Sequence, residues 1–276
     1  MTIAAGGTPI ARGPGGAGIE PFYFGDRDRS LFGCHQAPLT RMTRTCGILL
    51  CYPIGPEYIR SHRAFRQLAA RLSKAGFHVL RFDYSGCGDS AGDFETGRLD
   101  DWQRSISLAV DELKRRAGLS CVCVIGLRLG ATMALLVGAR RGCFDAMVLW
   151  NSVCDGAAYV RELQLWHESA GGGADPNRDD GFAEIVGYAF NRSLLDDIAH
   201  VDPLALLRQP AKRILFVHTG DTDENDRLPA CVQQLGAVVD RLRIPGPQLW
   251  LQEPYQAVIP HQALQSIVSW VTTVYA

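Results

Sequence analysis

The residues most suggestive of chemistry lie in the segment GLRLG, from Gly126 to Gly130. The apolar run before this segment predicts a strand, and the Ala- and Leu-rich run after it predicts a helix. A strand, a tight glycine-bounded turn and a helix outline a nucleophile elbow, in which the pattern G-x-S-x-G exposes a serine hydroxyl beside the first amides of the helix. Here the central residue is Arg128, whose guanidinium stays protonated and accepts no hydrogen bond. The segment therefore predicts the turn but not its usual chemistry.

Arg128 has two interpretations. If its side chain projects into a pocket, the guanidinium is a receptor for a carboxylate or a phosphate. If the side chain is buried, it needs an acidic partner, because an unpaired buried charge is costly. Asp83, Asp155 and Asp223 are the candidate partners. The sequence leaves both interpretations open.

The elements that must position this turn alternate between strand and helix. Strands are expected over 21–25, 31–38, 45–52, 77–82, 121–125, 146–150, 213–219 and 248–252. Helices are expected from about 61 to 76, and over 99–117, 131–141 and 260–275. This alternation predicts an α/β fold, a mostly parallel sheet with helices on both faces.

Two segments depart from this alternation. Residues 1–20 are rich in Gly and Pro, which predicts a disordered N-terminus. Residues 152–203 hold two helical patterns around a Gly- and Asp-rich loop, and we expect them to form a helical cap over the carboxyl edge of the sheet. Residues 21–276 are otherwise expected to form a single domain.

The composition argues against several classes of function. With 28 Lys and Arg against 29 Asp and Glu, the chain has no net positive charge that would attract nucleic acid or an anionic membrane. No apolar run reaches the roughly 18 residues of a membrane span, and the N-terminus lacks an export signal. Nine cysteines are an odd number, and several lie in expected buried strands, which favours a reducing cytoplasm. No spacing indicates a metal site or a nucleotide-binding loop, so we expect no metal and no cofactor.

Three separated motifs resemble the α/β-hydrolase superfamily, and the resemblance covers about 21–276. The segments LLCYPIGPEYIRSHRAFRQLA, VLRFDYSGCGDSAG and GLRLGA are similar to the hydrolase-like proteins associated with exosortase systems, which are relatives of the serine aminopeptidase group. Arginine at the elbow is not peculiar to this chain within that subgroup. The resemblance implies an oxyanion hole made by the backbone amide of Leu129 and that of Ile54 or Gly55.

The resemblance also implies places for an acid and a histidine. The acid follows the next-to-last strand, where Asp223 is the candidate and Asp221 the second choice; a solvated turn explains both equally well. The histidine follows the last strand, where this chain has Tyr255. His261, at the start of the final helix, is the histidine that could replace it, or it is a surface residue.

Three further side chains are expected near the pocket. Tyr58 and His62 follow the Ile54–Gly55 loop, and His62 is either a base or a helix-surface residue, with Ser61 as the helix N-cap. Cys87 is either a thiol nucleophile activated by Arg128 or a packing residue.

These residues support three hypotheses. The first is an enzyme that acts on an acyl ester or thioester, by hydrolysis or acyl transfer, without a serine nucleophile. In it the amides of Leu129 and of Ile54 or Gly55 stabilise an oxyanion, and Arg128 orients an anionic group. His261 supported by Asp223, or else His62, activates water or an acceptor. The second is a catalytically degenerate hydrolase that binds a ligand or a partner. The third is a non-hydrolytic catalyst, of cyclisation or elimination, in the same pocket.

The expected ligand is a small acyl compound, free or carried on a carrier protein, as the gene associations of the resembling subgroup imply. No nucleic-acid partner is expected, because the net charge is −1.

Overall fold

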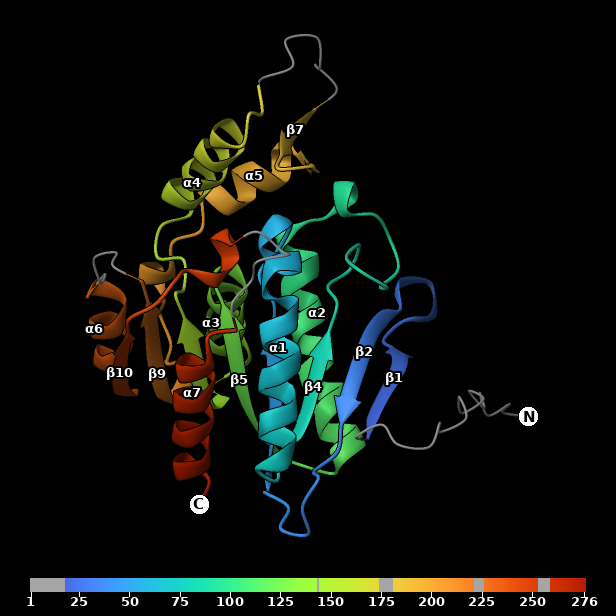
Figure 1. The fold of residues 1–276 in the computed structure, drawn as a ribbon, viewed down its shortest axis with the longest axis vertical. Helices are drawn as coiled ribbons and strands as arrows, with labels where there is room; N and C mark the ends of the chain where they lie inside the picture. The colour runs from blue at the N-terminus through green and yellow to red at the C-terminus, as the bar shows by residue number, and fades with distance from the viewer. Residues whose placement is uncertain (1–17, 143, 174–180, 221–225, 253–258) are drawn as a thin grey trace.

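The computed structural model describes residues 18–142, 144–173, 181–220, 226–252 and 259–276. Its centre is an eight-stranded sheet with the order β1-β2-β4-β3-β5-β6-β9-β10 (Figure 1). The strands are β1 (Ile19–Phe24), β2 (Leu31–Gln36), β3 (Cys46–Cys51), β4 (His78–Phe82), β5 (Cys121–Leu127), β6 (Phe144–Trp150), β9 (Ala211–Thr219) and β10 (Val238–Ile244). Only the pairs that involve β2 are antiparallel, so the expected mostly parallel sheet is confirmed.

Helices cover both faces of this sheet. They are α1 (Pro56–Lys74), α2 (Leu99–Ala117), α3 (Leu129–Arg141), α6 (Arg227–Gln234) and α7 (His261–Val274). The ring of Tyr52, just after β3, stacks on Phe65 of α1 with centroids 4.6 Å apart. Gly47 of β3 instead faces Leu113 of α2. Because successive side chains of a strand alternate between faces, α1 and α2 lie on opposite sides of the sheet.

The inserted segment lies above the carboxyl ends of the central strands (Figure 1). It consists of α4 (Gly156–Ser169), the hairpin β7 (Phe182–Ile185) and β8 (Tyr188–Asn191), and α5 (Arg192–Ala199). Phe190 of β8 is fully buried, and its ring meets that of Phe94 edge-on with centroids 4.9 Å apart. An aromatic side chain therefore joins this cap to the sheet domain. The two helical patterns expected here are present, whereas the short hairpin between them was not predicted from the sequence.

Some elements differ from the expectations. The last strand is β10, not 248–252, where the structure has a short 3-10 helix, η4 (Leu249–Leu251). β10 is an edge strand with polar and partly exposed residues, so it lacks the apolar run by which buried strands are recognised. Helix α1 begins at Pro56 rather than Ser61, because proline is favoured in the first helical turn. β1 begins at Ile19, so the expected disordered segment 1–20 overlaps a strand; residues 1–17 lie outside the described part.

Two glycines allow the turn between β5 and α3 to pack tightly. A Cβ atom on Gly126 would lie 2.4 Å from the Cα of Ala131, and one on Gly130 would lie 2.0 Å from the carbonyl oxygen of Tyr52. Both contacts involve backbone atoms, which cannot rotate away. These positions therefore require glycine, and they press the start of α3 against the end of β3.

We expect Gly130→Ala to lower the free energy of unfolding by about 3 kcal/mol, since the new methyl group forces the two segments apart. Urea titration measures this. Gly173→Ala is the matched control, because nothing lies within 4 Å of a Cβ there. Equal stability of the two variants would contradict the steric account.

A buried histidine makes stability depend on pH. His35 of β2 is buried, and its Nε2 lies 3.1 Å from Nδ1 of His78. Burial, followed by the neighbouring His78, lowers the pKa of His35 to about 4. As the pH falls from about 6.5 toward 4, the unfolded chain gains a proton that the folded chain does not, so the folded state loses stability.

We expect this histidine to contribute a loss of about 3 kcal/mol across that interval, measured by urea unfolding at several pH values. His35→Gln should flatten the slope, whereas replacement of the exposed His200 by Gln should leave it unchanged. An unaltered slope in His35→Gln would assign the pH dependence to other groups.

Candidate functional site

The turn after β5 has the backbone of a nucleophile elbow, with arginine at its centre. Arg128 has φ 53° and ψ −128°, in the left-handed half of conformational space that residues with side chains rarely adopt. Its amide donates to the carbonyl of Trp150 (3.0 Å), and its carbonyl accepts from the amide of Ala131 (3.1 Å). These bonds to the neighbouring strand and to the new helix hold the strained residue in place.

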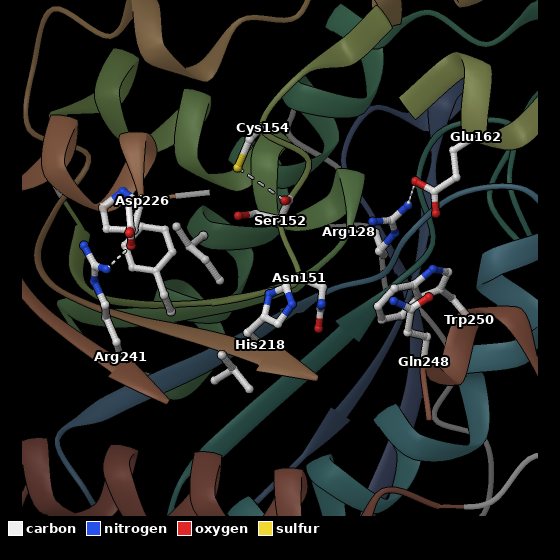
Figure 2. A pocket seen from close by; sticks show the side chains of 14 residues that line it. Arg128, Asn151, Ser152, Cys154, Glu162, His218, Asp226, Arg241, Gln248 and Trp250 are labelled. Atoms are coloured by element: carbon white, nitrogen blue, oxygen red, sulfur yellow. Dashed lines mark hydrogen bonds and ion pairs between the residues drawn. The ribbon is translucent and has the colours of Figure 1, made fainter. Parts of the chain in front are cut away.

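The side chain of Arg128 is held by two carboxylates. Its Nε donates to Oε1 of Glu57 (3.0 Å), and its Nη2 donates to Oε2 of Glu162 (2.5 Å). The guanidinium also lies over the rings of Trp250 (4.6 Å) and Tyr159 (5.2 Å). Figure 2 shows Arg128 between Glu162 and Trp250. Only 8% of the residue is exposed, so these contacts replace most of its hydration.

Glu57 is the buried member of this cluster. It lies in the first turn of α1, where the helix dipole favours a negative charge, and it is 1% exposed. Its second oxygen accepts a hydrogen bond from the hydroxyl of Tyr159 (2.8 Å). Burial raises the pKa of Glu57 despite the opposing effects of Arg128 and Tyr159. The cluster thus joins three elements, namely α1, the elbow and the cap helix α4.

The partners expected for Arg128 were wrong where the structure describes them. Asp83 accepts from the hydroxyl of Tyr58 (2.9 Å), and Asp155 caps α4 by accepting from the amide of Ala158 (2.8 Å). Asp223 and Asp221 lie outside the described residues. Glutamates fill the role because their longer side chains reach the guanidinium from α1 and from the cap.

A cavity of about 310 Å³ opens beside Arg128. Figure 2 shows the Arg128–Glu162 pair on one side of it, the Asp226–Arg241 pair on the other, and His218 and Asn151 between them. The other lining residues are Leu149, Ser152, Cys154, Phe216, Val217, Pro229, Gln248 and Trp250. The cavity therefore lies at the carboxyl ends of β6 and β9, the edge where ligands bind in open α/β sheets.

Asn151 fixes the floor of this cavity. It too has a positive φ, 43°, and its side-chain amide donates to the carbonyl of Thr219 (3.1 Å) while its side-chain oxygen accepts from the Thr219 amide (3.0 Å). These reciprocal bonds tie the end of β6 to the end of β9. This part of the cavity wall is thus held by hydrogen bonds between the Asn151 side chain and the Thr219 backbone.

The backbone donors expected for an oxyanion hole lie on two segments that are in contact near Gly130 and Tyr52, and their role stays a prediction. Leu129 is the first residue of α3, and Gly55 is the residue before α1. The first amides of a helix have no acceptor within the helix. Gly130 of the elbow packs against the carbonyl of Tyr52. Ile54 and Gly55 come two and three residues after Tyr52 in the chain.

Tyr58 and His62 both pack against the ring of Tyr52. The ring of His62 stacks on Tyr52 with centroids 5.9 Å apart and is 5.8 Å from Tyr58. Burial, then the cations Arg81 and Arg66, lower the pKa of His62. Neither side chain lines the cavity beside Arg128. Ser61, expected as an N-cap, is instead inside α1, and its hydroxyl donates to the carbonyl of Tyr58 (3.1 Å).

The structure does not bring His261 to the elbow. Its Nδ1 lies 2.6 Å from Nη2 of Arg71, which is about four turns, or roughly 20 Å, along α1 from Glu57. A hydrogen bond from arginine leaves Nδ1 as the acceptor, so no carboxylate orients this imidazole through that atom. Tyr255 lies outside the described residues.

Cys87 has no sign of an activated thiol. Burial and the nearby Asp83 raise its pKa to about 12, and Arg128 is not among the groups that shift it. A neutral thiol is a poor nucleophile. The expectation that Arg128 activates Cys87 is therefore not supported by the electrostatics.

Several residues of the site escaped the sequence analysis. Glu57 follows Pro56 and looks like an ordinary first-turn acid, whereas Glu162, His218 and Trp250 are distant in sequence from the elbow. The one available signal was the requirement that a buried Arg128 have an acidic partner. That requirement identifies the charge of the partner but not its position.

Within the described residues, no helix combines the length and apolar character needed to cross a membrane. The same part of the chain has no group of His, Cys, Asp and Glu arranged to hold a metal ion.

Half of the chain, residues 58–197, matches the family model described as serine aminopeptidase, S33. Over 95 residues the chain is 43% identical to protein ABHD12B of Homo sapiens, a match that spans 32% of this chain and 24% of that protein.

Two solved structures show the fold. Est1E from Butyrivibrio proteoclasticus with bound ferulic acid has a TM-score of 0.67 at 18% identity, over 91% of this chain and 96% of that one. A thermostable carboxyl esterase from Bacillus coagulans in complex with glycerol has a TM-score of 0.65 at 13% identity, over 94% and 99%. The predicted α/β-hydrolase fold is thus confirmed, while the narrower likeness to exosortase-associated proteins stays a prediction.

We expect Glu57→Ala to lower the free energy of unfolding by about 3 kcal/mol, because it leaves a buried guanidinium with one carboxylate fewer and the Tyr159 hydroxyl without its acceptor. Glu162→Ala is the matched control. The side chain of Glu162 is 44% exposed, so its loss should cost at most about 1 kcal/mol.

Urea unfolding compares the two variants directly. Combining Glu57→Leu with Arg128→Met should recover much of the loss, since an apolar pair leaves no buried charge. If Glu57→Ala and Glu162→Ala lose the same free energy of unfolding, the buried carboxylate contributes no more to stability than the exposed one.

Proposed function

Because the chain belongs to the serine aminopeptidase S33 family of α/β-hydrolases, we propose that it binds a small acyl compound beside Arg128 without forming an acyl-enzyme at the elbow. The observation that carries this proposal is the pairing of Arg128 with Glu57 and Glu162. The elbow residue is locked by two ion pairs and has no lone pair to donate. Covalent catalysis at this position is therefore replaced by a fixed hydrogen-bond donor.

The donor pattern supports recognition of a carbonyl group. Nε and Nη2 of Arg128 bind the glutamates, whereas Nη1 has no hydrogen-bond partner within the described part of the chain. Arg128 lines the cavity, so Nη1 can donate to an acyl oxygen placed there. The amides of Leu129 and Ile54 are proposed as further donors to the same oxygen.

The local charge favours a neutral acyl group over a free carboxylate. One guanidinium paired with two carboxylates gives the cluster a net negative charge. A negative cluster repels an anion, whereas the carbonyl of an ester, a thioester or an amide accepts a hydrogen bond without that penalty. A volume of about 310 Å³ is at the lower end of the range of ligand sites, which suits a short acyl group.

A second candidate function is hydrolysis or acyl transfer of an ester or thioester without a serine. Two observations favour it: the helix N-terminus at Leu129 adjoins the elbow, and an imidazole, that of His218, lines the cavity. In this scheme His218 activates water and the amides stabilise the oxyanion.

One experiment separates the two functions. The wild type, Arg128→Met and His218→Gln are tested with short p-nitrophenyl esters and acyl thioesters for turnover, and with the matching non-hydrolysable amides for binding by calorimetry. We expect amide binding in the wild type, a loss of roughly tenfold or more in Arg128→Met, and no acyl adduct by intact-mass spectrometry. Arg161→Gln, an exposed arginine on α4, is the control.

If the wild type turns over an ester or thioester and His218→Gln does not, the protein is a serine-independent hydrolase and the binding proposal is wrong. Unchanged amide binding in Arg128→Met would overturn the role proposed for Arg128. Thermal unfolding of each variant verifies that it is folded.

A further inference from the structure

A second cavity, of about 590 Å³, lies on the outer side of α1 where this helix passes β2 and β4. It is lined by Ile19, Gln36, Arg63, Arg66, Gln67, Ala70, Arg71, Lys74 and Arg81. None of these residues is acidic, and none lines the cavity beside Arg128. This basic groove is therefore a separate feature of the molecule.

Four of its cations form one stripe along α1. Arg63, Arg66, Arg71 and Lys74 all line the groove, so they project from the same side of the helix, although the step from Arg66 to Arg71 is five residues. None of the four forms an ion pair within the described residues, and Arg71 donates to His261. The last-turn residues Arg71 and Lys74 complement the helix dipole, but that effect does not extend to Arg63 and Arg66 in the middle of the helix.

A fifth cation forms part of the floor. Arg81 of β4 is only 7% exposed, and its Nη1 donates to the hydroxyl of Tyr52 (3.2 Å). Its Nε has no hydrogen-bond partner among the described residues. Asp83, two residues further along, already accepts from Tyr58 and from the amide of Asp89. A buried guanidinium with an unpaired N–H is costly, so this atom calls for an acceptor that the described chain does not supply.

Gln36 of β2 has a buried acceptor atom that lacks a donor among the described residues. The residue is 3% exposed and lines the same groove, and its Oε1 has no hydrogen-bond partner in the part of the chain that the structure describes. The lining of the groove thus includes a buried donor and a buried acceptor that have no partner among the described residues, below cations that form no ion pair there. A ligand that fits this pattern carries several anionic oxygens and a hydroxyl group.

We propose that this groove binds a small, soluble organic phosphate. A phosphate group supplies several strong acceptor oxygens to the guanidinium forks of Arg81, Arg66 and Arg63, and a hydroxyl of the ligand donates to Oε1 of Gln36. The cavity volume lies within the range of small-molecule sites. The stripe from Arg63 to Lys74 is only about 16 Å long, which suits one small molecule better than a nucleic-acid backbone.

Calorimetric titration of the full chain with glycerol 3-phosphate and with inorganic pyrophosphate, at low ionic strength, tests this site. We expect saturable binding in the wild type and a loss of roughly tenfold or more in the double variant Arg63→Gln/Arg66→Gln. Arg81→Lys keeps the charge but removes the fork, so it should also weaken binding. Arg63 and Arg66 are exposed, so we expect glutamine at these positions to leave the fold intact. Thermal unfolding of each variant verifies this.

Arg161→Gln/Arg208→Gln is the matched control, because it removes two exposed arginines outside the groove. If the control loses as much phosphate affinity as Arg63→Gln/Arg66→Gln does, the effect comes from overall charge and the proposed site is wrong. Failure of both phosphates to bind the wild type would overturn it as well. Binding only to vesicles that contain phosphatidic acid would assign the groove to a lipid headgroup in place of a soluble ligand.

Discussion

The buried ion pair between Arg128 and Glu57 is the interaction on which the site depends. It joins the elbow to the first turn of α1, and Tyr159 and Glu162 extend it to the cap helix α4. A buried charge pair adds little net stability compared with an apolar pair, but removing one member is strongly destabilising. The pair therefore acts mainly as a constraint: it holds the loop after β3, the elbow and the cap in one arrangement.

The elbow itself shows how backbone geometry persists when its usual chemistry is absent. Gly126 and Gly130 leave no room for a Cβ, and Arg128 keeps a positive φ. These features are demanded by the packing of α3 against β3 and are independent of which side chain stands at the centre. The fold is accordingly shared with solved structures at 13–18% identity, whereas Arg128 cannot supply the hydroxyl nucleophile of a G-x-S-x-G elbow.

Electrostatics divide the molecule into two different environments. The cavity beside Arg128 contains compensated charges, which suits a neutral polar group. The groove along α1 contains cations without carboxylates, which suits an anion. The overall charge of −1 conceals this difference, because an excess of one sign in one place is balanced elsewhere. Local charge, not net charge, thus guides the two ligand proposals.

The sequence by itself determined the fold class, the positions of the buried strands along the chain and the position of the elbow. Apolar runs, helical periodicity and glycine spacing are local properties and can be recognised without the structure. The sequence could not locate β10, whose exposed edge has no apolar run, or the β7–β8 hairpin. It required that a buried Arg128 be paired, but only the tertiary structure decided that Glu57 and Glu162 are the partners. It offered His261 as a base, and only the tertiary structure placed that residue beside Arg71. The physical reason is the same in each case: side chains that meet across the fold are separated by 71 or 190 residues in the chain, and no local pattern encodes such a contact.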